Sequence, residues 1–184
     1  MQEVLRTPLT PVGVNLESVG AVLPEMEFWF PVDGLPASAI DALCRDHLLA
    51  GCARPVLPER QLRGMLMGFA DAVFAHGGRY WVLDYKSNHL GDSDVDYTPE
   101  ALEGAMAAHR YDVQAAVYLL ALHRLLRVRL GADYDPMQHL GGAVFFFLRG
   151  IHSATHGCYH VPPSLEVLDA LDQLLHPQTE EVAP

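Results

Sequence analysis

A hairpin around Gly77-Gly78 is the stretch that most constrains how this chain folds. Two apolar runs rich in β-branched and aromatic residues, at 68–76 and 79–88, flank the glycine pair. This pattern predicts two antiparallel strands joined by a two-residue turn. In that register His76 faces Arg79, and Asp71 is expected opposite Asp84.

The predicted strand after the turn carries charges on one face. Side chains alternate along a strand, so Asp84 and Lys86 share a face with Tyr80 and Val82. The carboxylates of Asp71 and Asp84 would lie roughly 4.5–5.5 Å apart at Cβ. Facing like charges destabilise a hairpin, and a divalent cation is the natural compensation because hard cations take oxygen ligands. A turn shifted by one residue would separate the two acids, and Asp-x-Lys alone is common by chance.

Composition bounds the class of protein. The 184 residues, half of them apolar and 19% charged, predict one globular domain with a real core. The net charge of −11 argues against a free-standing, high-affinity nucleic-acid binder. It leaves open an enzyme that touches DNA through a metal and a few arginines. The start has no signal-peptide pattern, and the three cysteines show no metal-type spacing, which favours free thiols in a reducing compartment.

Upstream of the hairpin the patterns are weaker. Residues 1–20 have no clear period and predict neither a helix nor a hairpin of their own. Residues 25–32 predict a strand that Pro31 ends. Glu25 and Glu27 share one face of it, as a solvated edge or as part of a site. Residues 36–50 predict a short helix that Gly51 ends.

Downstream, a polar loop at 87–97 precedes a long helical pattern. Its acids do not match a Ca²⁺-binding EF-hand, because the glycine and the terminal glutamate are not at the required offsets. Thr98-Pro99 predicts a helix start, and the pattern runs to Leu130 with a break near 109–110. Gln114 and Tyr118 are four residues apart and share a face. Spacing alone favours ordinary half-buried polarity for this pair over a role in a site.

The last third of the chain completes an α/β pattern. Residues 141–149 predict a buried central strand, 157–161 a short strand, and Ser164 the cap of a final helix, before an acidic tail from Pro177. The order of strand, helix, hairpin, long helices, strand and helix predicts a mixed central sheet flanked by helices.

These residues resemble a known family. Asp71 followed, after a β-turn, by Asp84-Tyr85-Lys86 resembles the PD-(D/E)xK nuclease core. The strings at 68–71, 83–88 and 146–150, with the Gln-x-x-x-Tyr motif at 114–118, resemble the nuclease domains of the RecB family. The resemblance covers about residues 8 to 175. It implies a restriction-endonuclease-like fold and Mg²⁺-dependent hydrolysis of DNA phosphodiesters, with Mn²⁺ as a substitute.

The resemblance also implies roles for particular residues. Asp71 and Asp84 would be catalytic metal ligands, with the backbone carbonyl of Tyr85 as a third ligand. Lys86 would orient or activate the attacking water, or stabilise charge on the phosphate. Such chemistry is what carboxylate-held Mg²⁺ supports in phosphodiester hydrolysis.

Three further residues are implied to support this site. Glu25 matches the acid on the first core strand, with Glu27 as a weaker alternative. Gln114 and Tyr118 would support the metal site or contact the DNA strand. In one respect the chain departs from the family, which has a metal-binding histidine on a helix before the first core strand. None of the ten histidines lies before Met26.

The implied setting is a bacterial, cytoplasmic helicase–nuclease complex acting in double-strand break repair and recombination. Its implied partners are DNA fed as a single strand, the subunits RecC and RecD, and the recombinase RecA. Residues 1–184 are expected to be a single nuclease domain, truncated at its N-terminus from a larger subunit and weakened in metal affinity. Two alternatives remain: an interaction module that loads RecA with little or no cleavage, and a purely structural α/β domain.

Overall fold

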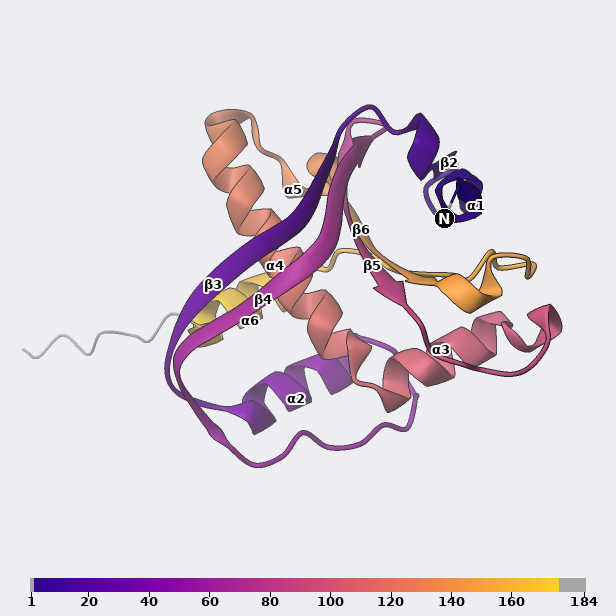
Figure 1. Cartoon of the computed structure of the whole chain (residues 1–184). Coiled ribbons are helices and arrows are strands. Elements are labelled where there is room, and N and C mark those ends of the chain that lie inside the picture. The colour runs from indigo at the N-terminus through magenta and orange to yellow at the C-terminus, as the bar shows by residue number, and fades with distance from the viewer. Residues whose placement is uncertain (1, 176–184) are drawn as a thin grey trace, which may run out of the picture.

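A mixed five-stranded sheet forms the centre of the molecule. The computed structural model describes residues 2–175, and the acidic tail expected from Pro177 lies outside them. The sheet order is β3-β4-β5-β6-β7, and only the β5–β6 pair is parallel (Figure 1). The strands are β3 (Val22–Pro36), β4 (Gln61–His76), β5 (Arg79–Lys86), β6 (Leu140–Phe147) and β7 (Cys158–Val161). The predicted α/β architecture is confirmed.

The β4–β5 hairpin has the register expected from its turn. Gly77 and Gly78 have φ of 61° and 77°, the left-handed conformation that a two-residue hairpin turn requires at both positions. Pairing runs from His76 with Arg79 to Ala72 with Leu83. Asp71 and Asp84 come directly after the last pair.

Strand β3 is longer than the sequence indicated. It continues through Pro31 to Pro36 and pairs with β4 along most of its length. The expectation that Pro31 ends the strand was wrong because β3 is an edge strand, where a missing N–H is tolerated. Met26 and Phe28 turn inward, whereas Trp29 between Phe28 and Phe30 is half exposed.

Helices cover one face of the sheet. Phe145 and Phe147 of β6 and Val82 of β5 pack in one large core with side chains from all four longer helices. Thr98 caps the first turn of α3 as predicted, accepting a bond from Ala101 N at 3.2 Å. The expected break at 109–110 separates α3 from α4. The helices are α2 (Ala37–His47), α3 (Pro99–Ala108), α4 (Tyr111–Leu130) and α6 (Leu165–Leu175).

The N-terminal segment covers the other face. Residues expected to lack structure form α1 (Gln2–Arg6) and a small sheet of β1 (Pro8–Leu9) with β2 (Val14–Asn15). Leu9 and Leu16 are buried there in a second core with Phe74 and Phe146. The expectation failed because a five-residue helix and two-residue strands are too short to show a period.

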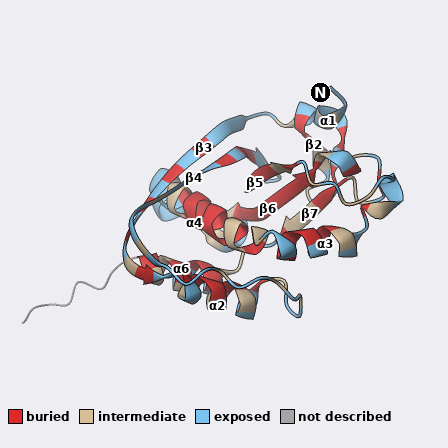
Figure 2. Ribbon diagram, turned by 60° about the horizontal axis from the view of Figure 1, so that its bottom comes forward, coloured by how far each residue is buried: buried red, intermediate tan, exposed pale blue. Residues whose placement is uncertain are grey.

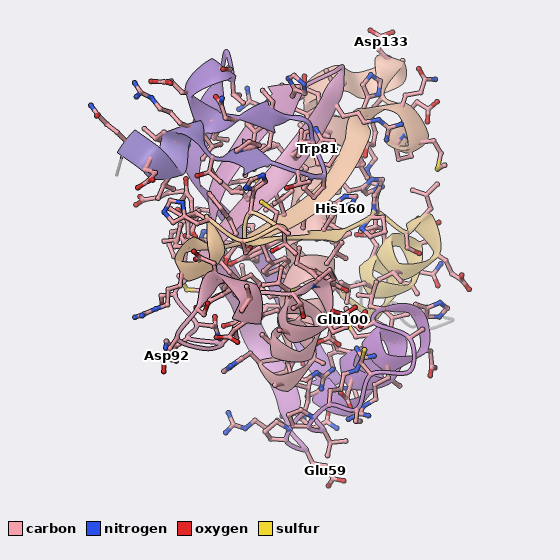
Figure 3. The ribbon with its side chains drawn as sticks, turned by 90° about the vertical axis from the view of Figure 1, so that its right-hand side faces the viewer. Glu59, Trp81, Asp92, Glu100, Asp133 and His160 are labelled. Atoms are coloured by element: carbon pink, nitrogen blue, oxygen red, sulfur yellow. The ribbon has the colours of Figure 1, made fainter. Side chains whose placement is uncertain are left out.

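Strand β6 is the most deeply enclosed strand. All eight of its residues are buried, whereas much of β3 and β4 is exposed (Figure 2). A Cβ on Gly141 would meet the Trp81 ring at 2.3 Å, so a glycine is required there. Trp81 and His160, labelled in Figure 3, have ring centroids 5.5 Å apart.

Shorter elements complete the chain. No helix among residues 2–175 combines the length and apolar character that a membrane span needs. Cys44, Cys52 and Cys158 are free thiols, as their number and spacing indicated. The remaining elements are the short helix α5 (Pro136–His139) and the 3₁₀ turns η1 (Leu16–Ser18), η2 (Asp94–Asp96), η3 (Gly131–Asp133) and η4 (Leu148–Gly150).

Candidate active site

The candidate site lies at the carboxyl end of β5, beneath the first half of α4. Asp84 and Lys86 are both buried, with 5% and 8% of their surface exposed. They face α4, and Tyr80 and Val82 belong to the core on the same side. The alternation along β5 is therefore the one that the sequence predicted.

Asp84 is the most heavily bonded of the candidate residues. Its Oδ2 lies 2.6 Å from Lys86 Nζ, and its Oδ1 accepts bonds from Tyr118 Oη at 3.0 Å and Gln114 Nε2 at 3.2 Å. Burial raises the pKa of the Asp84 carboxyl, the nearby Asp71 adds to this effect, and Lys86 and Tyr118 oppose it. Lys86 supplies the opposite charge that the facing acids require, and Gln114 and Tyr118 add hydrogen bonds to the buried carboxylate.

Gln114 links the acid to the lysine. Its Oε1 accepts a bond from Lys86 Nζ at 2.7 Å, while its Nε2 donates to Asp84 and, at 2.6 Å, to Tyr118 Oη. Because an ammonium can only donate, the contact with Lys86 fixes the orientation of the amide. The ordinary polarity that spacing favoured does not account for these contacts.

Tyr118 completes the buried network. Its hydroxyl also lies 2.7 Å from the carbonyl oxygen of Phe69 on β4. Burial and the neighbouring Asp84 raise the pKa of the Tyr118 phenol, so it stays protonated and acts as a donor. The side chains of α4 thus bond to both strands of the hairpin.

Asp71 lies at the edge of this cluster and is exposed. Its Oδ2 accepts a bond from the backbone N–H of Tyr85 at 2.7 Å. Its negative charge contributes to the raised pKa of the Asp84 carboxyl. Burial raises the pKa of the Tyr85 phenol, and the charge of Asp71 raises it further. The Tyr85 ring packs against Phe146, with centroids 6.1 Å apart. Asp71, Asp84 and the backbone of Tyr85 are therefore brought together.

The backbone of Glu25 lies next to Asp71 in the sheet, but its side chain does not join the cluster. It lies between the pairs Pro24–Ala72 and Met26–Ala70, and so opposite Asp71, with a left-handed φ of 50°. Its side chain is exposed, and within residues 2–175 no hydrogen bond or ion pair joins it to the cluster. Glu27 is likewise exposed and pairs with Phe69.

The donor set of the site suits a magnesium ion. The described part of the chain brings no three His, Cys, Asp or Glu side chains together as a metal cluster. Two carboxylates and a nearby backbone are nevertheless the kind of site that Mg²⁺ uses, because this ion keeps several waters and takes one or two protein carboxylates. Oδ1 of Asp71 has no protein partner among residues 2–175, which leaves an oxygen available.

An open groove leads to the cluster. It has a volume of about 460 Å³, runs between the β3–β4 ribbon and the start of α4, and includes Gln114 and Tyr118 in its wall. A polar cavity of about 620 Å³ lies beside the loop that follows β5 and is lined in part by His89 and Arg149. Arg149 Nε donates to Ser87 O at 3.1 Å, which places this arginine next to the end of β5.

Sequence reasoning missed Tyr111. The centroid of its ring lies 3.8 Å from Lys86 Nζ. The sequence did contain a signal for this contact: Tyr111 precedes Gln114 by three residues, and positions three apart share a helix face.

Comparison with known proteins agrees with this geometry. Residues 34–183 match the family model described as the PD-(D/E)XK nuclease superfamily. The chain is similar to RecBCD enzyme subunit RecB of Escherichia coli, with 46% identity over 98% of this chain and 16% of that protein. It is 34% identical to the RecB subunit of Haemophilus influenzae, over 94% of this chain and 14% of that protein.

A third RecB subunit, from Mycolicibacterium smegmatis, is 34% identical over 92% of this chain and 19% of its own length. The chain thus spans less than a fifth of these relatives. The family model covers most of the chain, including every candidate site residue except Glu25 and its alternative Glu27. The chain therefore belongs to the PD-(D/E)XK nuclease superfamily.

Proposed function

We propose that this chain hydrolyses phosphodiester bonds of DNA with the help of a divalent metal, Mg²⁺ by preference. The observation that carries the proposal is the buried carboxylate of Asp84, bonded to Lys86, Gln114 and Tyr118 and adjacent to Asp71. Buried charges are costly and cluster at functional sites. A purely structural domain would gain little from this arrangement.

Each residue has a distinct role in the proposal. Asp71 and Asp84, with the backbone carbonyl of Tyr85, would hold the metal. A bound Mg²⁺ would supply Lewis-acid stabilisation of phosphate charge and a nucleophilic water. Lys86 presents a cation to the phosphate or the attacking water.

The two residues of α4 have supporting roles. Gln114 orients Lys86, and Tyr118 donates to Asp84 and keeps that carboxylate in place. Glu25 would act only through a movement of its exposed side chain toward Asp71, across the β3–β4 pair.

The proposed substrate is a single DNA strand lying in the open groove beside Gln114 and Tyr118. The net charge of −11 opposes independent binding of DNA. We therefore propose that the chain works as the nuclease part of a larger helicase–nuclease subunit, alongside RecC and RecD in the bacterial cytoplasm. Such tethering raises the effective concentration of DNA at the site.

The first prediction concerns Asp84. Asp84→Ala should reduce cleavage of single-stranded DNA in Mg²⁺ by at least about a hundredfold, the scale on which loss of a key charge-stabilising group acts. The measurement is initial rate with a labelled oligonucleotide, using the full-length protein that carries this chain.

Asp133→Ala is the matched control, because Asp133 is exposed in the turn after α4, beyond the end of this helix opposite to Gln114 and Tyr118. Wild-type cleavage by Asp84→Ala would refute the proposed nuclease site. Calorimetric titration with Mg²⁺ and Mn²⁺ gives a second readout, in which only Asp84→Ala should lose binding.

One observation favours an interaction role as a second function. The outer face of the β3–β4 ribbon exposes about half of Trp29, Met65, Met67 and Phe69, and Trp29 pairs with Met67. Exposed apolar patches mark protein interaction sites. Loading of RecA by this face would require that Trp29→Ser with Met67→Ser weakens RecA binding and leaves cleavage intact.

A further inference from the structure

Lys86 is the only lysine of the 184-residue sequence, and protein groups contact its ammonium on three sides. Asp84 Oδ2 lies at 2.6 Å, Gln114 Oε1 at 2.7 Å, and the centre of the Tyr111 ring at 3.8 Å. Only 10% of the lysine side chain is exposed. The Phe145 ring also lies over this ammonium, with its centre farther away at 5.2 Å. Tyr111 is therefore the nearer of the two aromatic contacts, and neither has a part in the proposed site so far.

We infer that Tyr111 is a positioning residue for Lys86, which its ring face fixes in place. The inference rests on the proposed function of Lys86 in DNA cleavage. A cation over an aromatic face is attracted by the ring quadrupole, more strongly where water is excluded. Asp84 would share its charge with a bound metal, and Gln114 is itself bonded to Asp84. Tyr111 contacts Lys86 while its own hydroxyl bonds to Asn88, outside the proposed metal ligands.

The ring of Tyr111 is itself held on several sides. It stacks with His109 at 5.3 Å and with Phe145 of β6 at 5.8 Å, with interplanar angles of 18° and 17°. Its hydroxyl donates to Asn88 Oδ1 at 3.1 Å. A ring fixed in this way presents the same face to Lys86 without further ordering.

The backbone conformation at Arg110 determines where Tyr111 begins α4. Arg110 adopts the left-handed conformation, with φ 55° and ψ 38°, which is unfavourable for a residue with a Cβ. Its guanidinium pairs with Asp41 of α2 and, at 3.1 Å, with Asp112 Oδ1. These ion pairs hold the sharp corner between α3 and α4.

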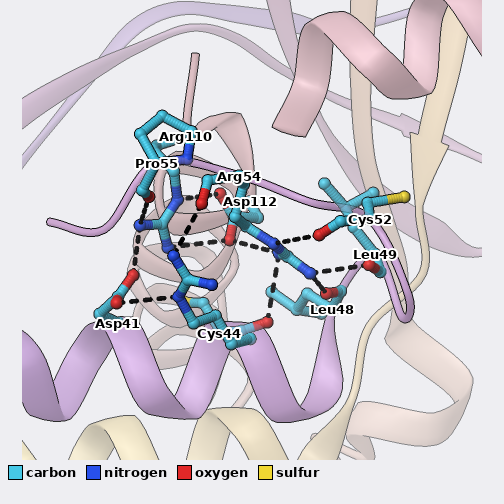
Figure 4. A network of polar contacts seen from close by, with 10 residues as sticks. Asp41, Cys44, Leu48, Leu49, Cys52, Arg54, Pro55, Arg110 and Asp112 are labelled. Carbon is cyan, nitrogen blue, oxygen red and sulfur yellow. Dashed lines mark hydrogen bonds and ion pairs between the residues drawn. The ribbon is translucent and has the colours of Figure 1, made fainter. Parts of the chain in front are cut away.

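A second arginine extends the network. Arg54, whose side chain is 2% exposed, lies 2.7 Å from Oδ2 of the fully buried Asp112 (Figure 4). The second terminal nitrogen of Arg54, Nη2, donates to the carbonyl oxygens of Leu48 and Leu49, just beyond the end of α2. The network therefore connects α2 and the loop after it to the first turn of α4. Tyr111, which contacts Lys86, lies in that turn.

Amine labelling of the single lysine tests the contact directly. The 184-residue chain would be treated with trinitrobenzenesulfonate, and modification at Lys86 followed by peptide mass spectrometry, which separates it from the N-terminal amine. Tyr111→Leu should speed modification of Lys86 roughly tenfold, as loss of a cation–π contact in a desolvated site implies. Tyr111→Phe keeps the ring face and should stay within about twofold of wild type.

Tyr134→Leu is the matched control. Tyr134 is also half-buried, stacks on a histidine (His139, 5.9 Å) and bonds through its hydroxyl to His123 Nδ1 at 2.8 Å, but does not contact Lys86. It should leave the labelling rate of Lys86 unchanged. Equal rates in wild type and folded Tyr111→Leu would overturn the inference. If circular dichroism shows that Tyr111→Leu is unfolded, Tyr111→Met takes its place.

Cleavage kinetics give the second readout. Tyr111→Leu should lower kcat about tenfold with KM unchanged, and Tyr111→Phe should restore kcat. A fall confined to KM would overturn the positioning role. The two failures are distinguishable, because an Asp84→Ala variant that still cleaves refutes the nuclease site, whereas unchanged Lys86 labelling refutes only the contact with Tyr111.

Discussion

At the scale of single residues, Gln114 connects the other buried groups of the candidate site. One amide accepts from Lys86 and donates to both Asp84 and Tyr118, so three buried polar groups depend on it. Truncation would therefore leave several buried groups unpaired at once, which costs more than the loss of a single hydrogen bond.

Gln114→Ala should lower kcat for DNA cleavage about tenfold to a hundredfold, since an unpaired buried group costs about 1–3 kcal/mol. Initial rates of cleavage of a labelled oligonucleotide, measured over a range of substrate concentrations, give this kcat. Gln138→Ala is the control, because Gln138 is exposed on α5 and bonds only to Asp135. Equal rates for the two variants would remove Gln114 from the site.

At the scale of elements, the corner between α3 and α4 depends on buried ion pairs. Asp112 has no exposed surface and accepts bonds from both Arg54 and Arg110. Burial raises the cost of each charge. Removing Asp112 would take the carboxylate from Arg54, which keeps only backbone carbonyls, and one of two carboxylates from Arg110, which keeps Asp41. Burial opposes ionisation of Asp41 too, but Arg110 and Arg45 outweigh it and lower the pKa of that carboxyl.

Asp112→Ala should therefore reduce the free energy of unfolding by about 3–5 kcal/mol. Urea denaturation followed by circular dichroism measures this change. Asp46→Ala, at an exposed position of α2, should change it by no more than about 0.5 kcal/mol. A loss below about 1 kcal/mol for Asp112→Ala would contradict this prediction, and would mean that water or the remaining acceptors satisfy the two arginines.

Local signals predicted several elements and missed others for a physical reason. The Gly77-Gly78 turn fixed the hairpin register, and Thr98-Pro99 marked a helix start, because each depends on neighbouring residues alone. The pairing of Arg54 with Asp112 joins residues far apart in sequence and leaves no periodic trace. The same holds for the contact of Lys86 with Tyr111, which exists only once β5 lies beneath α4.

At the scale of the whole molecule, two histidines tie stability to pH. Burial is the main cause that lowers the pKa of His123, in the helical layer, and of His160, on β7. The unfolded chain then binds protons more readily than the native one below the ordinary histidine pKa of about 6.5. The free energy of unfolding is therefore full above that pH and falls as the pH drops through the lowered pKa values.

Thermal melts between pH 7.5 and 5 should show this loss as a falling Tm. His123→Gln should make the dependence shallower, whereas His89→Gln, on an exposed loop, should leave it as in the wild type. An identical slope in His123→Gln would assign the acid sensitivity to other groups.

The two ends of β5 are far apart, so a label can be attached near one end without disturbing the other. The exposed Gly77–Gly78 turn lies at one end and Lys86 at the other, about 25 Å away for eight residues of strand. A fluorophore or surface tether inserted at this turn would stand clear of the groove and leave the carboxyl ends of β5 and β6 free. Single molecules immobilised there could be tested for the proposed passage of a DNA strand through the groove.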